Sequence, residues 1–185
     1  MNIYIFRRDL RIFDNNGINF LKNKDITPIF IYDKRQIDRK NNKYFSHKCV
    51  QFLDESLNDL DKSIKKYNGK LNFFYGNSAE DVIRDIIKNN NISSITFVKD
   101  YTKFSNNRDN NIRDMCTTNN IKCNIIDDIT LYDINKITTK SGNPYKKFKW
   151  FYKSTQSMNV LRPSDKSKLL KFNSTTLGFA MLILN

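Results

Sequence analysis

The chain lacks the glycine-rich and histidine-rich patterns on which several kinds of catalysis depend. It has five glycines in 185 residues, and neither G-x-G-x-x-G nor G-x-x-x-x-G-K-[ST] occurs, so the usual phosphate-cradling loops are missing. Its one histidine, His47, is too little for a zinc site or a Ser-His-Asp triad. We therefore expect no catalytic residue and no metal site in this chain.

Long apolar runs and paired cysteines are also missing. No stretch approaches the roughly 20 apolar residues that a membrane helix needs, so we expect no membrane association. Residues 1–6 lead directly into arginines and an aspartate, which is unlike a secretory signal. Cys49, Cys116 and Cys123 form no C-x-x-C pair and indicate reduced, buried thiols. These features favour the cytoplasm or the nucleus.

Positive charge is in excess, with 32 Lys plus Arg against 19 Asp plus Glu and a formal net charge of +13. A basic surface binds nucleic acid by releasing counterions. Here, however, the excess is mostly lysine scattered among many Asn and Ile residues, as expected from an A/T-rich genome, and only residues 140–153 approach a concentrated patch. We attribute the charge first to composition and keep a basic nucleic-acid-binding accessory protein as an alternative.

Short apolar runs alternate with longer amphipathic segments. Residues 3–6, 27–32, 71–75, 95–98 and 123–126 are β-branched or aromatic and predict five buried strands. Between them, apolar residues recur at helical spacing from Val50 to Tyr67, behind a potential cap at Ser46. Further helix starts are expected at Asp14, at Ser78 with Asp81, and at Ser105 or Asn106.

This alternation predicts an α/β fold of the Rossmann-like, doubly wound class. We expect a five-stranded parallel sheet with strand order 3-2-1-4-5 and helices on both faces. The direction of winding reverses between the first and fourth strands, which opens a crevice at their carboxyl ends. Residues 7–16 and 99–105 would border that crevice.

The domain organisation is expected to change after the last strand. Residues 1–130 form the predicted α/β domain, and residues 131–171 form a loop-rich segment that packs on it, including the aromatic residues Trp150, Phe151 and Tyr152. Residues 172–185 carry no charge and end in the apolar run 179–184, and we expect this tail to be poorly ordered.

One motif is more specific than the alternation. Residues 6–15 read FRRDLRIFDN and resemble the opening signature of the photolyase and cryptochrome family. Further similar segments follow in the same order at residues 29–33, 51–60, 100–109 and 142–148, so the resemblance covers residues 1–153. After Phe148 the family usually continues Thr-Pro-Phe, where this chain has Lys149, Trp150 and Phe151.

The resemblance is to the family's N-terminal α/β domain, which holds a light-harvesting antenna chromophore. It implies a photolyase-like DNA repair flavoprotein, a lyase that splits pyrimidine dimers under light. The helical domain that binds the catalytic FAD and the DNA lesion has no counterpart here, so the chain is expected to be split or truncated and inactive alone. A separate chain would then supply FAD, and DNA would bind through the complete enzyme.

The resemblance also implies where the antenna lies. The implied cofactor-binding residues come from three loops and strand ends: Arg8, Asp9, Tyr32, Asp33, Asp100, Tyr101 and Arg108. Asp100 matches an aspartate that contacts a deazaflavin, whereas Phe104 and Ser105 replace the Asn-Glu pair that contacts folate. A flavin or deazaflavin antenna is therefore favoured over folate. Two alternatives remain. The charged residues could form ion pairs that only hold the loops in place, or the chain could be a nucleotide-binding or regulatory α/β module without light function.

Overall fold

The computed structural model describes residues 1–160, 162–163 and 169–177. Its centre is a parallel sheet with strand order β3-β2-β1-β4-β5. The strands are β1 (Asn2–Phe6), β2 (Asp25–Asp33), β3 (Asn72–Gly76), β4 (Ser94–Val98) and β5 (Lys122–Ile126). The predicted order and parallel direction are confirmed. A short further strand, β6 (Lys171–Phe172), pairs in parallel with the start of β2.

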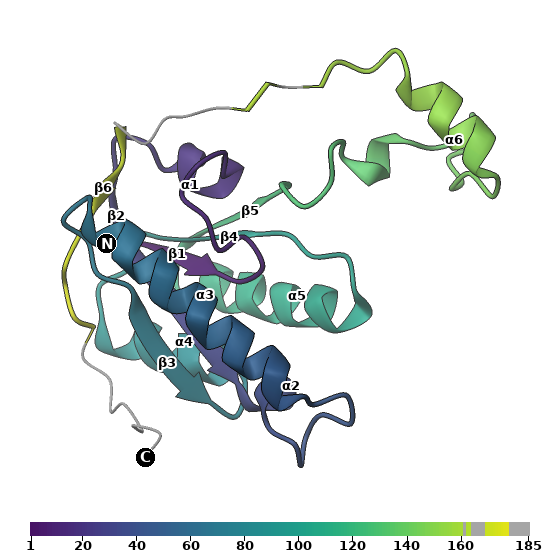
Figure 1. Ribbon diagram of the computed structural model, residues 1–185. Helices are drawn as coiled ribbons and strands as arrows, with labels where there is room; N and C mark the ends of the chain where they lie inside the picture. The colour runs from purple at the N-terminus through teal and green to yellow at the C-terminus, as the bar shows by residue number, and fades with distance from the viewer. Residues whose placement is uncertain (161, 164–168, 178–185) are drawn as a thin grey trace.

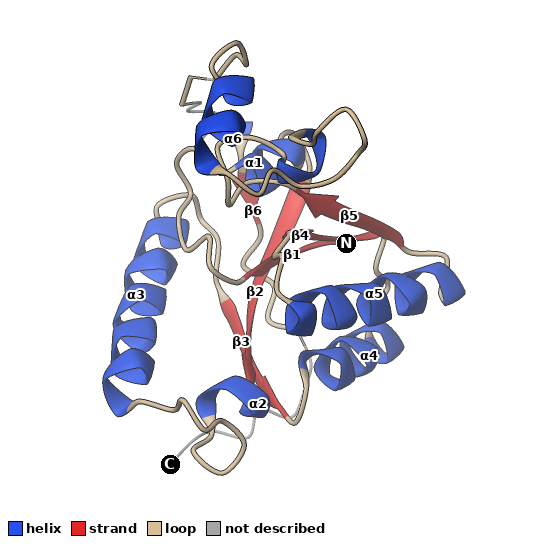
Figure 2. Cartoon of the chain, turned by 90° about the vertical axis from the view of Figure 1, so that its right-hand side faces the viewer, coloured by secondary structure: helices blue, strands red, loops and turns tan. Residues whose placement is uncertain are grey.

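Helices cover both faces of the sheet, as predicted (Figures 1 and 2). Helices α1 (Asn16–Phe20) and α3 (His47–Lys65) pack on one face. Helices α4 (Ala79–Asn89) and α5 (Lys103–Thr118) pack on the other. The remaining helical segments are α2 (Lys34–Ile37), the 3-10 turn η1 (Ile134–Lys136) and α6 (Phe148–Thr155).

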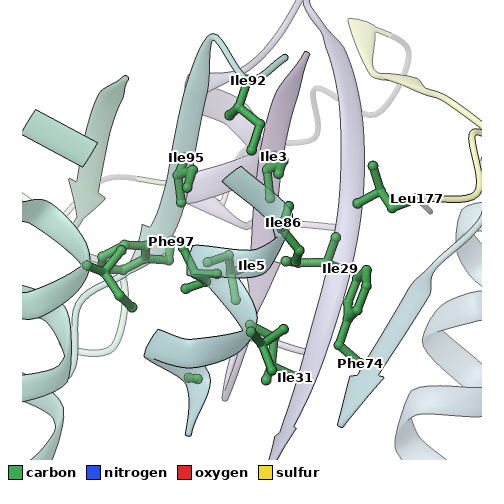
Figure 3. Close-up of a cluster of buried hydrophobic side chains, with 14 of the residues drawn as sticks. Ile3, Ile5, Ile29, Ile31, Phe74, Ile86, Ile92, Ile95, Phe97 and Leu177 are labelled. Carbon is green, nitrogen blue, oxygen red and sulfur yellow. The ribbon is translucent and has the colours of Figure 1, made fainter. Parts of the chain in front are cut away.

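Alternation along β1 divides the core into two layers. Ile3 and Ile5 face α4 and α5, where Figure 3 shows them beside Ile29, Ile95 and Phe97. Tyr4 and Phe6 point to the opposite face and pack with residues from α1 and α3. Because successive side chains of a strand point to opposite faces, one short strand contributes to both cores. Both halves of the sheet therefore depend on β1.

The helix caps differ in part from the prediction. Ser78 caps α4 as predicted, because its Oγ accepts from the backbone N–H of Asp81 at 3.1 Å. The predicted cap at Asp14 was wrong, since Asn15 caps α1 by accepting from the N–H of Ile18. Thr102, rather than Ser105 or Asn106, caps α5. Ser46 occupies the cap position of α3, but its side chain makes no capping hydrogen bond.

The chain after β5 leaves the sheet and then returns to it. Helix α6 stands apart from the sheet in Figure 1. Trp150 and Tyr152 on this helix are 52% and 54% exposed. The prediction that these two residues pack on the sheet was therefore wrong. The chain returns through β6, and Leu177 is buried in the core with Phe74. The apolar run 179–184 lies outside the described residues, and the proposed segment boundaries stay a prediction.

The structure also shows the exposure of the three thiols and the character of the helices. Cys116 is buried and Cys123 is half-buried, but Cys49 is exposed, which corrects the expectation for that residue. Within the part of the chain that the structure describes, no helix has both the length and the apolar character needed to cross a membrane.

Truncation of Leu57 tests the assignment of the buried face of α3. Leu57 is 1% exposed in the core, whereas Phe52 on the same helix is 71% exposed. We expect Leu57→Ala to lower the free energy of unfolding by about 2 to 5 kcal/mol because it leaves a cavity, and Phe52→Ala to change it little. Urea denaturation followed by circular dichroism measures both, and an unchanged midpoint for Leu57→Ala would contradict the assignment.

Candidate ligand-binding site

A cavity of about 160 Å³ lies at the carboxyl ends of β1, β2 and β4. It occupies the point where the winding of the sheet reverses, which is where ligands bind in open α/β sheets. Its lining contains Ile5, Phe6, Arg7, Arg8, Asp9, Phe30, Ile31, Asp33, Gln36, Leu53, Ala79, Ile83, Val98, Asp100, Arg108 and Ile129. Nine of these residues are apolar, and three arginines and three aspartates line the same cavity.

The charged groups begin with a buried ion pair behind the cavity. Arg7 follows β1 directly, and its Nη1 lies 2.8 Å from Oδ1 of Asp109 on α5. The same oxygen accepts from Nε of Arg108 at 3.0 Å. Burial and the neighbouring Arg108 lower the pKa of Arg7 to about 10, although Asp109 acts in the opposite direction. Two guanidinium groups thus share one carboxylate in a place with little water.

These groups do not satisfy one another completely. Nη2 of Arg7, Nη2 of Arg108 and Oδ2 of Asp109 are buried without a hydrogen-bond partner among the described residues. The Arg7 guanidinium also lies 4.0 Å from the centroid of the Phe97 ring, a favourable cation–π contact. An ion cluster of this kind is costly to bury, so it constrains how β1 and α5 can pack.

A second pair connects the loops after β1 and β4. Nε of Arg8 lies 3.2 Å from Oδ2 of Asp100, and the Arg8 side chain is 69% exposed. Burial acts to raise the pKa of Asp100, but hydrogen bonds from the backbone of Thr102 and Tyr101, together with Arg8, outweigh it and leave the pKa below its usual value. Asp100 is therefore a carboxylate, a hydrogen-bond acceptor, at neutral pH.

A third group joins β2 to α4 and α5. Asp33 is 3% exposed, and its carboxylate accepts from the backbone N–H groups of Arg35 and Ala79. The Arg35 side chain binds both Asp33 and Glu80. Its guanidinium also lies 4.8 Å from the ring centroid of Phe104, at the start of α5. This chain of contacts links α2 to α5 beside the cavity.

Asp9 lines the cavity, but its oxygens are already engaged. They accept from the hydroxyl of Tyr4, from the amide of Asn15 at 2.9 Å and from the backbone N–H of Arg7 at 3.1 Å. Burial and the nearby carboxylate of Asp9 raise the pKa of the Tyr4 hydroxyl well above its usual value, so Tyr4 stays a donor. In this structure Asp9 shapes the loop after β1.

Two of the residues implied by the resemblance lie outside the lining. The hydroxyl of Tyr32 donates to Asp54 on α3 at 2.8 Å, on the opposite face of the sheet from α4. The hydroxyl of Tyr101 donates to Asp127 at 2.5 Å. Burial is the main cause that raises the pKa of Tyr101 to about 12. The structure thus brings Arg8, Asp9, Asp33, Asp100 and Arg108 together and leaves the two tyrosines outside.

Sequence reasoning missed several residues of the site, including Gln36, Leu53 and the partner of Arg7, Asp109. A signal for Asp109 was present, because helical spacing places it on the same face of α5 as the buried Ile112 and Cys116. A carboxylate on a buried face needs a cationic partner. Among the described residues, no cluster of His, Cys, Asp and Glu is suited to hold a metal ion.

A cavity with polar and apolar lining lies at the switch point of this doubly wound parallel sheet, which is the position where open α/β domains bind small molecules. More specifically, the chain belongs to the DNA photolyase family, since the model of that family, described as DNA photolyase, matches residues 2–168. This confirms the resemblance carried by residues 6–15 and by the segments that follow it.

Individual relatives agree. Cryptochrome-1 of Aedes aegypti is 32% identical over 149 residues, which are 76% of this chain and 27% of that protein. The deoxyribodipyrimidine photo-lyase of Buchnera aphidicola is 26% identical over 176 residues, covering 89% of this chain and 35% of that one. The archaeal photolyase of Sulfolobus tokodaii superposes with a TM-score of 0.79 at 36% identity, covering 94% of this chain and 38% of that structure.

These matches define the extent of the similarity. A cryptochrome from Synechocystis has a TM-score of 0.83 at 20% identity, which shows the shared fold alone. The chain spans about a quarter to a third of the length of the curated relatives and somewhat more of the solved structures. The matched part is the N-terminal α/β domain of the family.

Removing the charge of Asp109 tests the ion cluster. We expect Asp109→Asn to lower the free energy of unfolding by about 3 to 5 kcal/mol, because Arg7 and Arg108 would remain buried without a counter-charge. Asp114→Asn is the matched control, since that side chain lies on the same helix and is 75% exposed. Urea denaturation compares the two variants, and equal stabilities would mean that the cluster contributes nothing to the fold.

Proposed function

We propose that this chain is the antenna-chromophore domain of a photolyase-like DNA repair flavoprotein, and that the cavity at the ends of β1, β2 and β4 receives a flavin or deazaflavin chromophore. One observation carries the proposal: Arg8, Asp33, Asp100 and Arg108 line one cavity together with apolar side chains at the switch point of the sheet. A few placed polar groups over an apolar surface are typical of sites for flat heterocyclic ligands.

The chemistry of the lining suits such a ring system. Flavin-type rings expose carbonyl oxygens and ring N–H groups along one edge and an aromatic face along the plane. Arg8 and Arg108 can donate to the carbonyl oxygens, and Asp100, ionised at neutral pH, can accept from an N–H. The bound chromophore would absorb near-UV or blue light, while the chain fixes its orientation and excludes water.

The size of the cavity limits how much of the ligand can enter. Pockets that enclose drug-sized ligands measure about 300 to 1,000 Å³, and this cavity measures about 160 Å³. We therefore infer that the polar end of the ring enters the cavity and that the rest lies across the contact between Arg35 and Phe104. That contact involves a single side chain from each of α2 and α5, so a ligand can displace it.

The type of chromophore is supported from two directions. The structure of the Sulfolobus tokodaii photolyase was described with two FAD molecules and with the implication of a novel light-harvesting cofactor, which favours a flavin here. Folate is less favoured because Ser105 is buried and bonded to Thr102, and Phe104 lies against Arg35. In the family members that bind folate, an Asn side-chain amide and a Glu carboxylate contact it, and Phe104 and Ser105 supply neither group.

The rest of the complete enzyme belongs to the same proposal. The catalytic FAD and the site for the DNA lesion would lie in a helical domain on a separate chain, with DNA bound through the assembled enzyme in the cytoplasm or nucleus. The alternative is a nucleotide-binding or regulatory α/β module that has kept the fold and lost light function. Chromophore binding separates these two functions.

Titration of the purified chain with flavin mononucleotide, a deazaflavin and methenyltetrahydrofolate tests the proposal. We expect saturable quenching of fluorescence with the first two ligands and weaker or no binding of the third. Asp100→Ala should weaken binding about tenfold or more, because it removes a charged acceptor from the cavity. Arg84→Ala, an exposed residue of α4 outside the cavity lining, should leave the Kd unchanged.

The outcomes distinguish the alternatives clearly. If none of the three ligands binds saturably, the antenna proposal is contradicted. The alternative that then remains is a nucleotide-binding or regulatory α/β module without light function. Binding that Asp100→Ala does not weaken would place the chromophore elsewhere on the chain.

A second experiment concerns repair activity. We expect the chain alone to repair no thymine dimers under blue light, because an enzyme that acts on a base must enclose the extruded nucleotide in a dedicated pocket. An irradiated oligonucleotide, the purified chain, FAD and a reductant are illuminated, and dimer loss is followed by restored restriction cleavage. Repair above a control without protein would show that the chain contains a second flavin site.

A further inference from the structure

Helix α6 presents an exposed aromatic and basic surface that the cavity does not involve. We define the α6 surface as the aromatic residues Phe148, Trp150 and Tyr152 together with Lys146, Lys147, Lys149 and Lys153. The three rings are 75%, 52% and 54% exposed, respectively. All four lysines are exposed as well. Figure 1 shows the helix projecting away from the sheet, so none of the described helices and strands forms a layer over it.

The charge of this segment is unusually one-sided. Residues 134–164 contain seven lysines and arginines and no aspartate or glutamate, whereas charges of both signs are mixed in residues 1–133. None of the four lysines of the α6 surface forms an ion pair with a described residue. The composition of the whole chain explains many lysines, but it does not explain 31 consecutive residues without an acid.

Helical geometry interleaves the rings with the charges. Phe148 and Tyr152 are four residues apart, and their rings stack with centroids 5.9 Å apart. Lys149 and Lys153 lie about 100° further round the helix, and Trp150 about 100° beyond Lys149. Nζ of Lys153 lies 5.9 Å from the centroid of Trp150. Two lysines thus separate an aromatic pair from the tryptophan on one continuous exposed face.

This arrangement restricts the chemistry of a partner. An apolar protein groove would cover the rings, but it would also remove water from Lys149 and Lys153 without neutralising them, which is costly. An acidic protein surface would neutralise the lysines and leave the rings without a flat apolar partner. A single-stranded nucleic acid supplies both, since its bases stack on aromatic rings and its phosphates pair with lysines.

We propose that the α6 surface binds single-stranded nucleic acid. Bases stack on Trp150 and on the Phe148–Tyr152 pair, and the lysines contact the backbone phosphates. A duplex fits less well, because its bases are already stacked and paired and cannot receive the rings. This binding is independent of the cavity and of any chromophore.

Fluorescence anisotropy with labelled oligothymidylate of about 12 nucleotides and the full chain tests this inference. We expect the single strand to bind more tightly than a duplex of the same length. Four lysine–phosphate contacts predict a salt slope of about −3, so affinity should fall about 50-fold between about 50 and 200 mM salt.

Paired variants separate the contributions of the rings and the charges. Lys149→Glu with Lys153→Glu should weaken binding at least tenfold and flatten the salt slope by about 1.4. The control Lys62→Glu with Lys88→Glu makes the same charge change on exposed residues of α3 and α4. Trp150→Ala with Tyr152→Ala should weaken single-strand binding about fivefold or more per ring, while Tyr44→Ala with Phe52→Ala removes two other exposed rings.

Three results would overturn the inference: no binding at about 50 mM salt, equal affinity for single strand and duplex, or equal losses in the test and control variants. The last result would trace any binding to the net charge of the chain. Circular dichroism of each variant must match that of the native chain, and the exposed position of every substituted residue makes this condition attainable.

Discussion

The carboxyl edge of the sheet is organised around one buried charge, the guanidinium of Arg7 at the end of β1. Alternation along β1 directs Arg7 to the same face as Ile3 and Ile5, under α5, where an isolated cation would be strongly unfavourable. Asp109 neutralises it and so fixes α5 against β1 and β4. The loop that begins at Arg7 is then held by Asp9 and Asn15, and these contacts set one border of the cavity.

The balance of charge at this edge determines what can bind there. Three arginines and three aspartates line the cavity, and most of them already bond to one another or to the backbone. A strongly anionic ligand would gain little net charge attraction from such a lining, since three aspartates stand among the three arginines. A flat, nearly neutral heterocycle that carries both donors and acceptors could replace each hydrogen bond that it breaks among the lining side chains with one of its own. If the proposed function holds, the lining would select a ligand by the placement of its polar atoms more than by its net charge.

Most of the fold was predictable because the strands carry a strong local signal, whereas the caps and the exposed surfaces depend on contacts between distant segments. Asn15 and Thr102 compete with neighbouring Asp14, Ser105 and Asn106, all of which are good capping residues, so sequence alone could not choose between them. Tyr32 could have been placed correctly, because strict alternation puts it with Phe30, toward α3. The aromatic run in α6 resembled core residues, and only the path of the chain after β5 shows that it is exposed.

Binding at the cavity and binding at the α6 surface should depend differently on salt concentration. This difference allows the two proposed functions to be separated in one protein. Contacts in the cavity are short and partly buried, so salt should screen them only slightly. The α6 surface carries lysines without described ion-pair partners. Its affinity for a polyanion should fall steeply with rising salt, because the release of counterions then contributes less free energy to binding. A chromophore that stays bound while a nucleic acid dissociates at rising salt would identify two independent sites, whereas a common salt dependence would indicate a single composite surface.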